Sequence, residues 1–305
     1  MKFLKPEQSF GLNFDRGMIL FEFDALREPE KTRFPQVGEW LRSRCEFNEI
    51  QTPKMLWRGK LWPDLYIANQ LDAVREGVCG DTFGIGSHAR NKAKWNDSYS
   101  LEIASIENHG EAFHAEFIEP MCRKISGRPS SEISAKYHRS IWLPLYWPET
   151  LRARQSLRTP FYYPRAGFAG AATAGIGAGA KPAHQQIRGS NADRVEIRLE
   201  FVTIKPLPER EFSVLFVVDD SPIYRITDLD VCAGIETEFH RWVVEFRGDH
   251  SGMQRLGLAA GGFQSCSFSR VQMDLPTLDN VKRGWKPRPN INEKLWEIMS
   301  AEPGA

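Results

Sequence analysis

The stretch that decides the fold runs from Phe212 to Phe246, FSVLFVVDDSPIYRITDLDVCAGIETEFHRWVVEF. It contains two apolar runs, 212–218 and 242–246, with the length and composition of buried β-strands. We expect these runs to be adjacent strands of one sheet. A turn after the first run leads into Tyr224 and Arg225. This pair is expected where the sheet meets a cleft.

Tyr224 and Arg225 have two interpretations. Arginine grips phosphate or carboxylate bidentately, and tyrosine stacks or donates a hydrogen bond, so the pair could hold an anionic substrate. Alternatively, Arg225 lies at a sheet edge in solvent or in a structural ion pair. From residue types alone the structural alternative is favoured, because structural ion pairs are common.

The segments before this stretch predict further strands and a helix. Residues 194–205, RVEIRLEFVTIK, alternate apolar and polar positions as a half-buried strand does. Residues 35–48 carry apolar positions at helical spacing. Residues 50–68 predict a short hairpin around Arg58-Gly59, and residues 10–24 a strand-rich opening. The chain also predicts short helices at 250–257 and in the tail.

Residues 109–126 repeat apolar positions at the helical period. Pro120 would kink that helix, and Gly127 fits its C-terminal end. Ser131 or Ser134 could cap a following helix that runs through 137 and 141 to 144.

Composition excludes several classes of protein. The 305 residues include 40 basic and 39 acidic residues, which argues against a dedicated nucleic-acid binder. No stretch approaches the ~20 apolar residues of a membrane span, and the first residues lack the apolar core of a secretory signal. The five cysteines form no CxxC pair, and the seven histidines show no metal-ligand spacing. We therefore expect a cytoplasmic protein with no metal site.

Two segments carry the letters of the dinucleotide fingerprint, GIGSHA at 84–89 and GIGAGA at 175–180. The fingerprint requires an apolar strand before the glycines and a helix after them. The first lacks a convincing strand, and the second is closed by Lys181-Pro182. Both are interpreted as ordinary glycine-rich loops.

Several stretches, in order along the chain, resemble the FAD-dependent superfamily of UDP-galactopyranose mutases, protoporphyrinogen-oxidase-like proteins and amine oxidases. These stretches are FGLNFDRGMIL, EIQTPKMLWRGKLWPDL, HGEAFHAEFIEPMCRKISGRPSSEISAKYHRSIW, FYYPRAGFAG and SPIYRITD with WVVEF. The resemblance is discontinuous but spans most of the chain. Each motif is loose by itself, and their order is the stronger signal.

The resemblance assigns roles to five residues. It implies that Arg225 faces a substrate diphosphate, that Arg139 is a second phosphate-facing arginine, and that Tyr224 lines the same cleft. It places Pro164 and Gly167 beside the edge of the flavin as main-chain neighbours. The implied cofactor is FAD, and the implied substrate is a sugar nucleotide or another small polar, anionic molecule.

The sequence shows no counterpart of the opening GxGxxG…E unit of this family, or of its closing flavin-covering segment. We therefore expect an α+β, α/β-derived chain: a truncated FAD/NAD(P)-binding-type fold with a mixed β-sheet substrate domain and a helical insertion. The expected parts are 1–68, a remnant of the FAD-domain strands and hairpin; 69–160, the helical insertion; and 161–305, the mixed sheet with its tail. A partner chain could carry the missing dinucleotide-binding unit.

Two functions follow. The first is a flavin-dependent oxidoreductase or mutase-like enzyme, in which no side chain is assigned as the catalytic base. The second is a non-catalytic remnant that keeps the fold and binds a ligand or partner. A gene that starts upstream, or an interrupted reading frame, would also account for the missing unit.

Overall fold

The computed structural model describes residues 35–50, 53–62, 98–109, 111, 114–141, 161–166, 194–205, 212–247, 263–285 and 299–300. The helices and helical turns are α2 (Pro35–Arg44), α4 (Leu101–His109), η5 (His114–Ile118), α6 (Glu119–Ser126), η6 (Ser130–Glu132), η7 (Ala135–Ile141), α9 (Leu229–Ala233) and α11 (Leu278–Lys282). The strands are β1 (Phe47–Ile50), β2 (Lys54–Trp57), β3 (Lys60–Trp62), β4 (Phe161–Pro164), β5 (Arg194–Ile204), β6 (Val214–Val217), β7 (Ile223–Asp228), β8 (His240–Arg247) and β9 (Phe263–Asp274).

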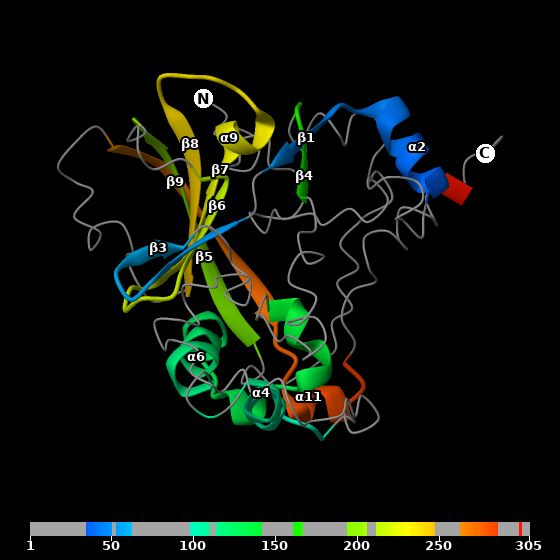
Figure 1. Cartoon of the computed structure of the whole chain (residues 1–305), viewed down its shortest axis with the longest axis vertical. Coiled ribbons are helices and arrows are strands. Elements are labelled where there is room, and N and C mark those ends of the chain that lie inside the picture. The colour runs from blue at the N-terminus through cyan, green and yellow to red at the C-terminus, as the bar shows by residue number, and fades with distance from the viewer. Residues whose placement is uncertain are drawn as a thin grey trace.

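Seven of these strands form one mixed sheet in the order β3-β2-β6-β7-β8-β5-β9 (Figure 1). β2 and β6 pair in parallel, and the other neighbours in the sheet pair antiparallel. β1 and β4 form a separate two-stranded antiparallel ribbon. The expectation of an α+β fold with a mixed sheet is confirmed.

The prediction that the runs 212–218 and 242–246 are adjacent strands is wrong. A third strand, β7, lies between them, because it pairs with β6 on one side and with β8 on the other. All six residues of β7 are buried. Its sequence, IYRITD, conceals this burial because half of its residues are polar. β8 supplies partners to two of them, Arg225 and Asp228.

The sheet is buried on both faces, because consecutive residues of its strands contribute to two different hydrophobic clusters. Phe201, Phe216 and Val243 belong to the larger cluster, which also contains residues of α2, α6 and β2. Val202 and Val244, each next to one of these along the chain, belong to a smaller cluster with Phe212 and Phe246. This alternation follows from the two-residue period of a strand.

The predicted hairpin around Arg58-Gly59 is confirmed. Both residues have positive φ, 55° and 70°, and they link β2 to β3. A two-residue turn with positive φ at both positions matches the twist of the strands that it joins. The carboxylate of Asp219 accepts hydrogen bonds from the backbone N–H groups of Arg58 and Gly59, the latter at 2.8 Å. The β6–β7 turn therefore holds the β2–β3 turn.

The segment predicted as a helix at 109–126 holds two helical elements within the described residues, and the kink expected at Pro120 stays a prediction. A π-helical turn, η5, precedes α6, and Pro120 lies in the first turn of α6, where its missing N–H costs little. Gly127 ends α6 with φ 71°, and its N–H donates to the carbonyl of Arg123 at 2.8 Å. This confirms the predicted C-terminal stop.

The helix predicted after Ser131 or Ser134 does not form as an α-helix within the described residues. Two short 3₁₀ turns, η6 and η7, occupy this region, and neither serine hydroxyl is its cap. The hydroxyl of Ser134 is buried and makes no hydrogen bond. The backbone of Ser134 instead bridges to Ser100 and donates to the carbonyl of Pro276 at 2.8 Å, so tertiary pairing prevails over the local helical pattern.

Other expectations concern residues outside the described ranges: the opening 10–24, both glycine-rich segments, residues 250–257 and most of the tail helix. The division at 68 and 160 stays a prediction. β2 and β3, from the first predicted part, share the seven-stranded sheet with strands of the third. Among the described residues, no helix has the length and hydropathy needed to cross a bilayer.

Candidate functional site

Tyr224 and Arg225 lie in the interior of the sheet. The Arg225 side chain is 1% exposed and its ion-pair partner, Glu245 on β8, is 0% exposed. Arg225 Nε donates to Glu245 Oε1 at 2.6 Å, and Tyr224 Oη donates to Glu245 Oε2 at 2.9 Å. This geometry is that of a structural ion pair. A role for Arg225 and Tyr224 in binding substrate stays a prediction.

A β-bulge explains how two consecutive residues reach one carboxylate. The register between β7 and β8 shifts between Ile223 and Arg225, and Arg225 lies opposite Glu245. A bulge re-aims the side chains next to it, so Tyr224 and Arg225 need not point to opposite faces. Burial raises the pKa of Glu245, and it also raises the pKa of Tyr224 well above the usual range. The phenol is therefore protonated and acts as a hydrogen-bond donor.

β7 continues directly into the short helix α9, and the β1–β4 ribbon rests on this helix. Asp228 caps α9, because its carboxylate accepts the N–H groups of Asp230 and Val231 at 3.1 and 3.0 Å. The same carboxylate accepts Trp242 Nε1 at 2.8 Å and pairs with His240 Nδ1 at 2.6 Å. α9 is therefore fixed to the first residues of β8.

The ribbon of β1 and β4 rests on α9 through one of its two faces. Asn48 on β1 donates from Nδ2 to the carbonyl of Cys232 on α9 at 3.0 Å. Tyr163, which pairs with Asn48 across the ribbon, is 3% exposed. The alternate residues Phe47, Glu49 and Tyr162 point to the opposite face, because side chains alternate along a strand. That opposite face borders a pocket.

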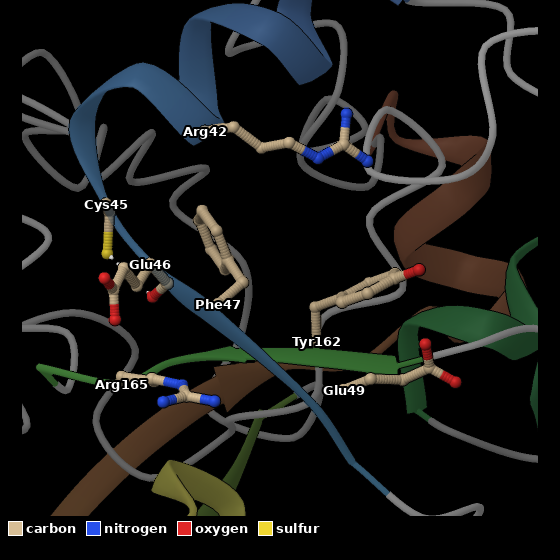
Figure 2. Close-up of a pocket in the computed structure, with 7 residues that line it drawn as sticks. All are labelled: Arg42, Cys45, Glu46, Phe47, Glu49, Tyr162 and Arg165. Carbon is tan, nitrogen blue, oxygen red and sulfur yellow. Dashed lines mark hydrogen bonds between the residues drawn. The ribbon is translucent and has the colours of Figure 1, made fainter.

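The pocket lies between the end of α2 and the β1–β4 ribbon (Figure 2). Its volume is about 620 Å³, within the range of small-molecule sites. Two rings, two carboxylates, two guanidinium groups and one thiol line it: Phe47, Tyr162, Glu46, Glu49, Arg42, Arg165 and Cys45. The formal charges of this lining balance. The pocket thus combines aromatic surface with charges of both signs.

Among the described residues, three charged groups of the lining have no partner of their own. Within the described part of the chain, the side chains of Glu46, Glu49 and Arg165 make no hydrogen bond or ion pair. All three residues are exposed. They are available to a ligand that carries complementary charges.

Cys45 is not suited to act as a nucleophile. Burial raises the pKa of its thiol, and the neighbouring charge of Glu46 raises it further. The thiol donates to the carbonyl of Glu46 at 3.3 Å. A protonated thiol is a poor nucleophile, so Cys45 contributes surface to the pocket. Among the residues that the structure describes, no group of three or more histidine, cysteine, aspartate or glutamate side chains could hold a metal ion.

The predicted site residues divide between the two sheets. Tyr224 and Arg225 belong to the seven-stranded sheet, whereas Pro164 is the last residue of β4 and pairs with Phe47 beside the pocket. Arg139 lies in η7, but its side chain falls outside the described residues, as does the whole of Gly167. The roles of Arg139, Pro164 and Gly167 stay predictions.

Sequence reasoning missed the residues that line the pocket. The segment FYYPRAGFAG was singled out, but its pairing with residues 47–50 joins positions more than a hundred apart in the chain. The sequence held one usable signal. The exposed Glu49 is followed by the apolar, buried Ile50, and such a change is typical of a strand with one open face.

Comparison with known proteins gives a likeness in structure. No model of a known protein family matches the chain, and no curated protein matches it in sequence. A crystal structure of reduced UDP-galactopyranose mutase matches with a TM-score of 0.54 and 15% identity, over 94% of this chain and 75% of that one. At this identity the likeness concerns the fold. The expected likeness in fold to UDP-galactopyranose mutase is confirmed, and the truncation stays a prediction.

Two further structures match with lower TM-scores. A double mutant of putrescine oxidase has a TM-score of 0.47 and 10% identity, over 90% of this chain and 87% of its own. A Rab GDI from Plasmodium falciparum has a TM-score of 0.42 and 12% identity, over 95% of this chain and 79% of its own.

Proposed function

We propose that this chain is a flavin-dependent oxidoreductase or mutase-like protein that acts on a sugar nucleotide or another small polar substrate. The observation that carries the proposal is the fold shared with UDP-galactopyranose mutase over 94% of the chain. The location of Pro164 agrees with it, since the residue expected beside the flavin edge lies next to the pocket. Ligand sites of this volume commonly bind small molecules.

Neither the pocket lining nor Arg225 offers a site for the diphosphate of FAD. The two arginines of the pocket are matched by two glutamates, so the lining offers no net positive charge. Arg225 is neutralised by Glu245 in the sheet interior. We infer that the groups that bind the diphosphate lie elsewhere in the chain or on a partner chain. No side chain of the pocket is therefore assigned a catalytic step.

The proposal is tested by the visible absorbance of the purified chain and by its thermal denaturation with added FAD. Both are measured for the chain alone and after co-expression with neighbouring gene products. We expect flavin absorbance, or a rise in melting temperature with FAD, in at least one of the two preparations, because ligand binding to the folded state stabilises it. Colourless protein with no FAD-dependent shift in either preparation would contradict the proposal.

A second function is favoured by one observation. Arg225, which the resemblance assigns to a substrate diphosphate, forms an ion pair with the buried carboxylate of Glu245. This arrangement suits a non-catalytic protein that keeps the fold and binds a ligand or partner. In that case the pure protein binds its ligand without turnover. Flavin-dependent reduction of any substrate by this chain would reject the second function.

A further inference from the structure

We propose that the ammonium group of Lys124 is a charge-dependent latch that holds two adjoining turns of the seven-stranded sheet. The first is the β6–β7 turn at 218–222, and the second is the β2–β3 turn at Arg58 and Gly59. Removing the charge of this one side chain would open both turns together. The inference concerns the conformation of the chain and does not require that the chain binds a flavin.

Four main-chain carbonyl groups of one short segment converge on the side chain of Lys124. This lysine lies on α6, and its Nζ donates to the carbonyls of Val217 at 2.9 Å and Val218 at 3.2 Å. It also donates to the carbonyl of Asp219 and, at 3.4 Å, to that of Ile223. Main-chain carbonyls grouped in this way can replace the water around a cation. The segment from β6 to β7 therefore curls around a cation that another element supplies.

The charge of the amino group is what this arrangement requires. An ammonium group has three N–H donors and no acceptor, whereas a neutral amine has two donors and a lone pair that repels carbonyl oxygens. Burial lowers the pKa of Lys124 to about 8, although the nearby charges of Asp219 and Asp220 oppose this change. The group is therefore mostly charged at neutral pH. Its hydrogen bonds to the four carbonyls are of the charge-assisted, stronger kind.

The β6–β7 turn transmits this constraint to the β2–β3 turn. The carboxylate of Asp219, a residue whose carbonyl contacts the latch, accepts the N–H groups of Arg58 and Gly59. The N–H of Val218, another of the four residues, donates to the carbonyl of Leu56 at 2.8 Å. If the segment leaves the ammonium group, these hydrogen bonds lose their fixed acceptor and donor. The two turns should therefore open as one unit.

A second link joins the same turns to the helical segment, and it is the weaker one. Arg58 pairs with Glu116 on η5, but the two side chains are 46% and 45% exposed. Exposed ion pairs contribute little to stability. Lys124 is only partly exposed and donates to carbonyls, which leave its position less free than a pair of long, solvated side chains. Loss of Lys124 should therefore not be compensated by the pair of Arg58 with Glu116.

The test is hydrogen–deuterium exchange of the full chain and of Lys124→Gln, which keeps part of the aliphatic stem and removes the charge. We expect exchange at least about tenfold faster in peptides that cover 53–62 and 212–223, because the variant loses charged hydrogen bonds. Lys282→Gln changes an exposed lysine of α11 and is the matched control, which should leave both peptides unchanged. Unchanged exchange in Lys124→Gln, or faster exchange in 212–223 alone, would overturn the inference.

Chemical rescue separates the charge of Lys124 from the packing of its stem. Lys124→Ala leaves space for a small alkylammonium ion, so added ethylammonium should slow the exchange of both peptides again. Tetramethylammonium at the same ionic strength has no N–H donor and should not. Equal effects of the two cations, or no effect of ethylammonium, would contradict the latch. Circular dichroism verifies folding; if neither neutral variant folds, Lys124→Arg decides, because it keeps a charged donor and must fold for the inference to stand.

Discussion

At the scale of single residues, the buried group of Tyr224, Arg225 and Glu245 has the largest expected effect on stability. Replacing Glu245 with alanine leaves the Arg225 guanidinium in the sheet interior without its carboxylate. Removing one partner of a buried ion pair costs about 3–5 kcal/mol. We therefore expect Glu245→Ala to lower the free energy of unfolding by that amount, as measured by urea denaturation.

The control for this variant is Glu238→Ala. Glu238 pairs with Lys205 at 3.3 Å, but both side chains are largely exposed, 69% and 64%. Exposed pairs contribute about 0–1 kcal/mol. Equal denaturation midpoints for the two variants would show that the buried pair has no special role in stability.

At the scale of elements, Glu119 connects the first turn of α6 to η6. Its carboxylate accepts the N–H of Ser130 at 2.9 Å and pairs with Arg123. Burial alone would raise the pKa of Glu119, but hydrogen bonds from Ser130 and Arg123 bring it below its ordinary value of 4.5. A lowered pKa means that the carboxylate stabilises the folded state above pH 4.5, and that this contribution is lost as the pH falls through the folded value.

We therefore expect the chain to be more stable than Glu119→Gln near neutral pH, and the difference to shrink below pH 4.5. The measurement is the free energy of unfolding of both proteins across this range. The analogous change Glu132→Gln removes an exposed pair with Arg128, 3.3 Å apart, and should change the free energy of unfolding by less than about 1 kcal/mol. A difference that grows toward low pH would contradict this assignment.

The end of α6 gives a second element-scale prediction. Gly127 has φ 71°, and a Cβ there would lie 2.7 Å from Arg247 Nη1, which itself donates to the carbonyl of Arg123 at 3.0 Å. Gly127→Ala should therefore lower the melting temperature through both backbone strain of about 1–2 kcal/mol and displacement of Arg247. Gly59→Ala has a similar φ of 70° with no atom near the added Cβ. It should show the strain alone, and a smaller effect at Gly127 than at Gly59 would refute this account.

At the scale of the whole molecule, the sequence patterns predicted those strands, turns and helix ends that depend on neighbouring residues. The alternation of 194–205, the Arg58-Gly59 turn and the glycine after α6 were all readable, since each depends on residues next to one another. The interior position of β7 was not readable. Glu245 on β8 supplies the partner that Tyr224 and Arg225 need in the sheet interior, and those contacts join residues about twenty apart.

The candidate site was readable only in part. Pro164 and its segment were singled out, whereas the pocket required β1 and β4 to pair across the chain. Nothing in the composition of residues 42–49 indicates that their open face would border a cavity. Likewise, the ion pair of Arg225 with Glu245 was not readable, because nothing in the local sequence marks Glu245 as its partner.

We propose that this fold positions a flavin beside the β1–β4 ribbon, next to Pro164. Hydrogen–deuterium exchange of the chain, or of the co-expressed assembly, with and without FAD tests it most directly. We expect slower exchange with FAD in peptides that cover residues 46–50 and 161–166, next to Pro164. FAD binding that leaves these two segments unchanged, or an absence of FAD binding in both preparations, would contradict it.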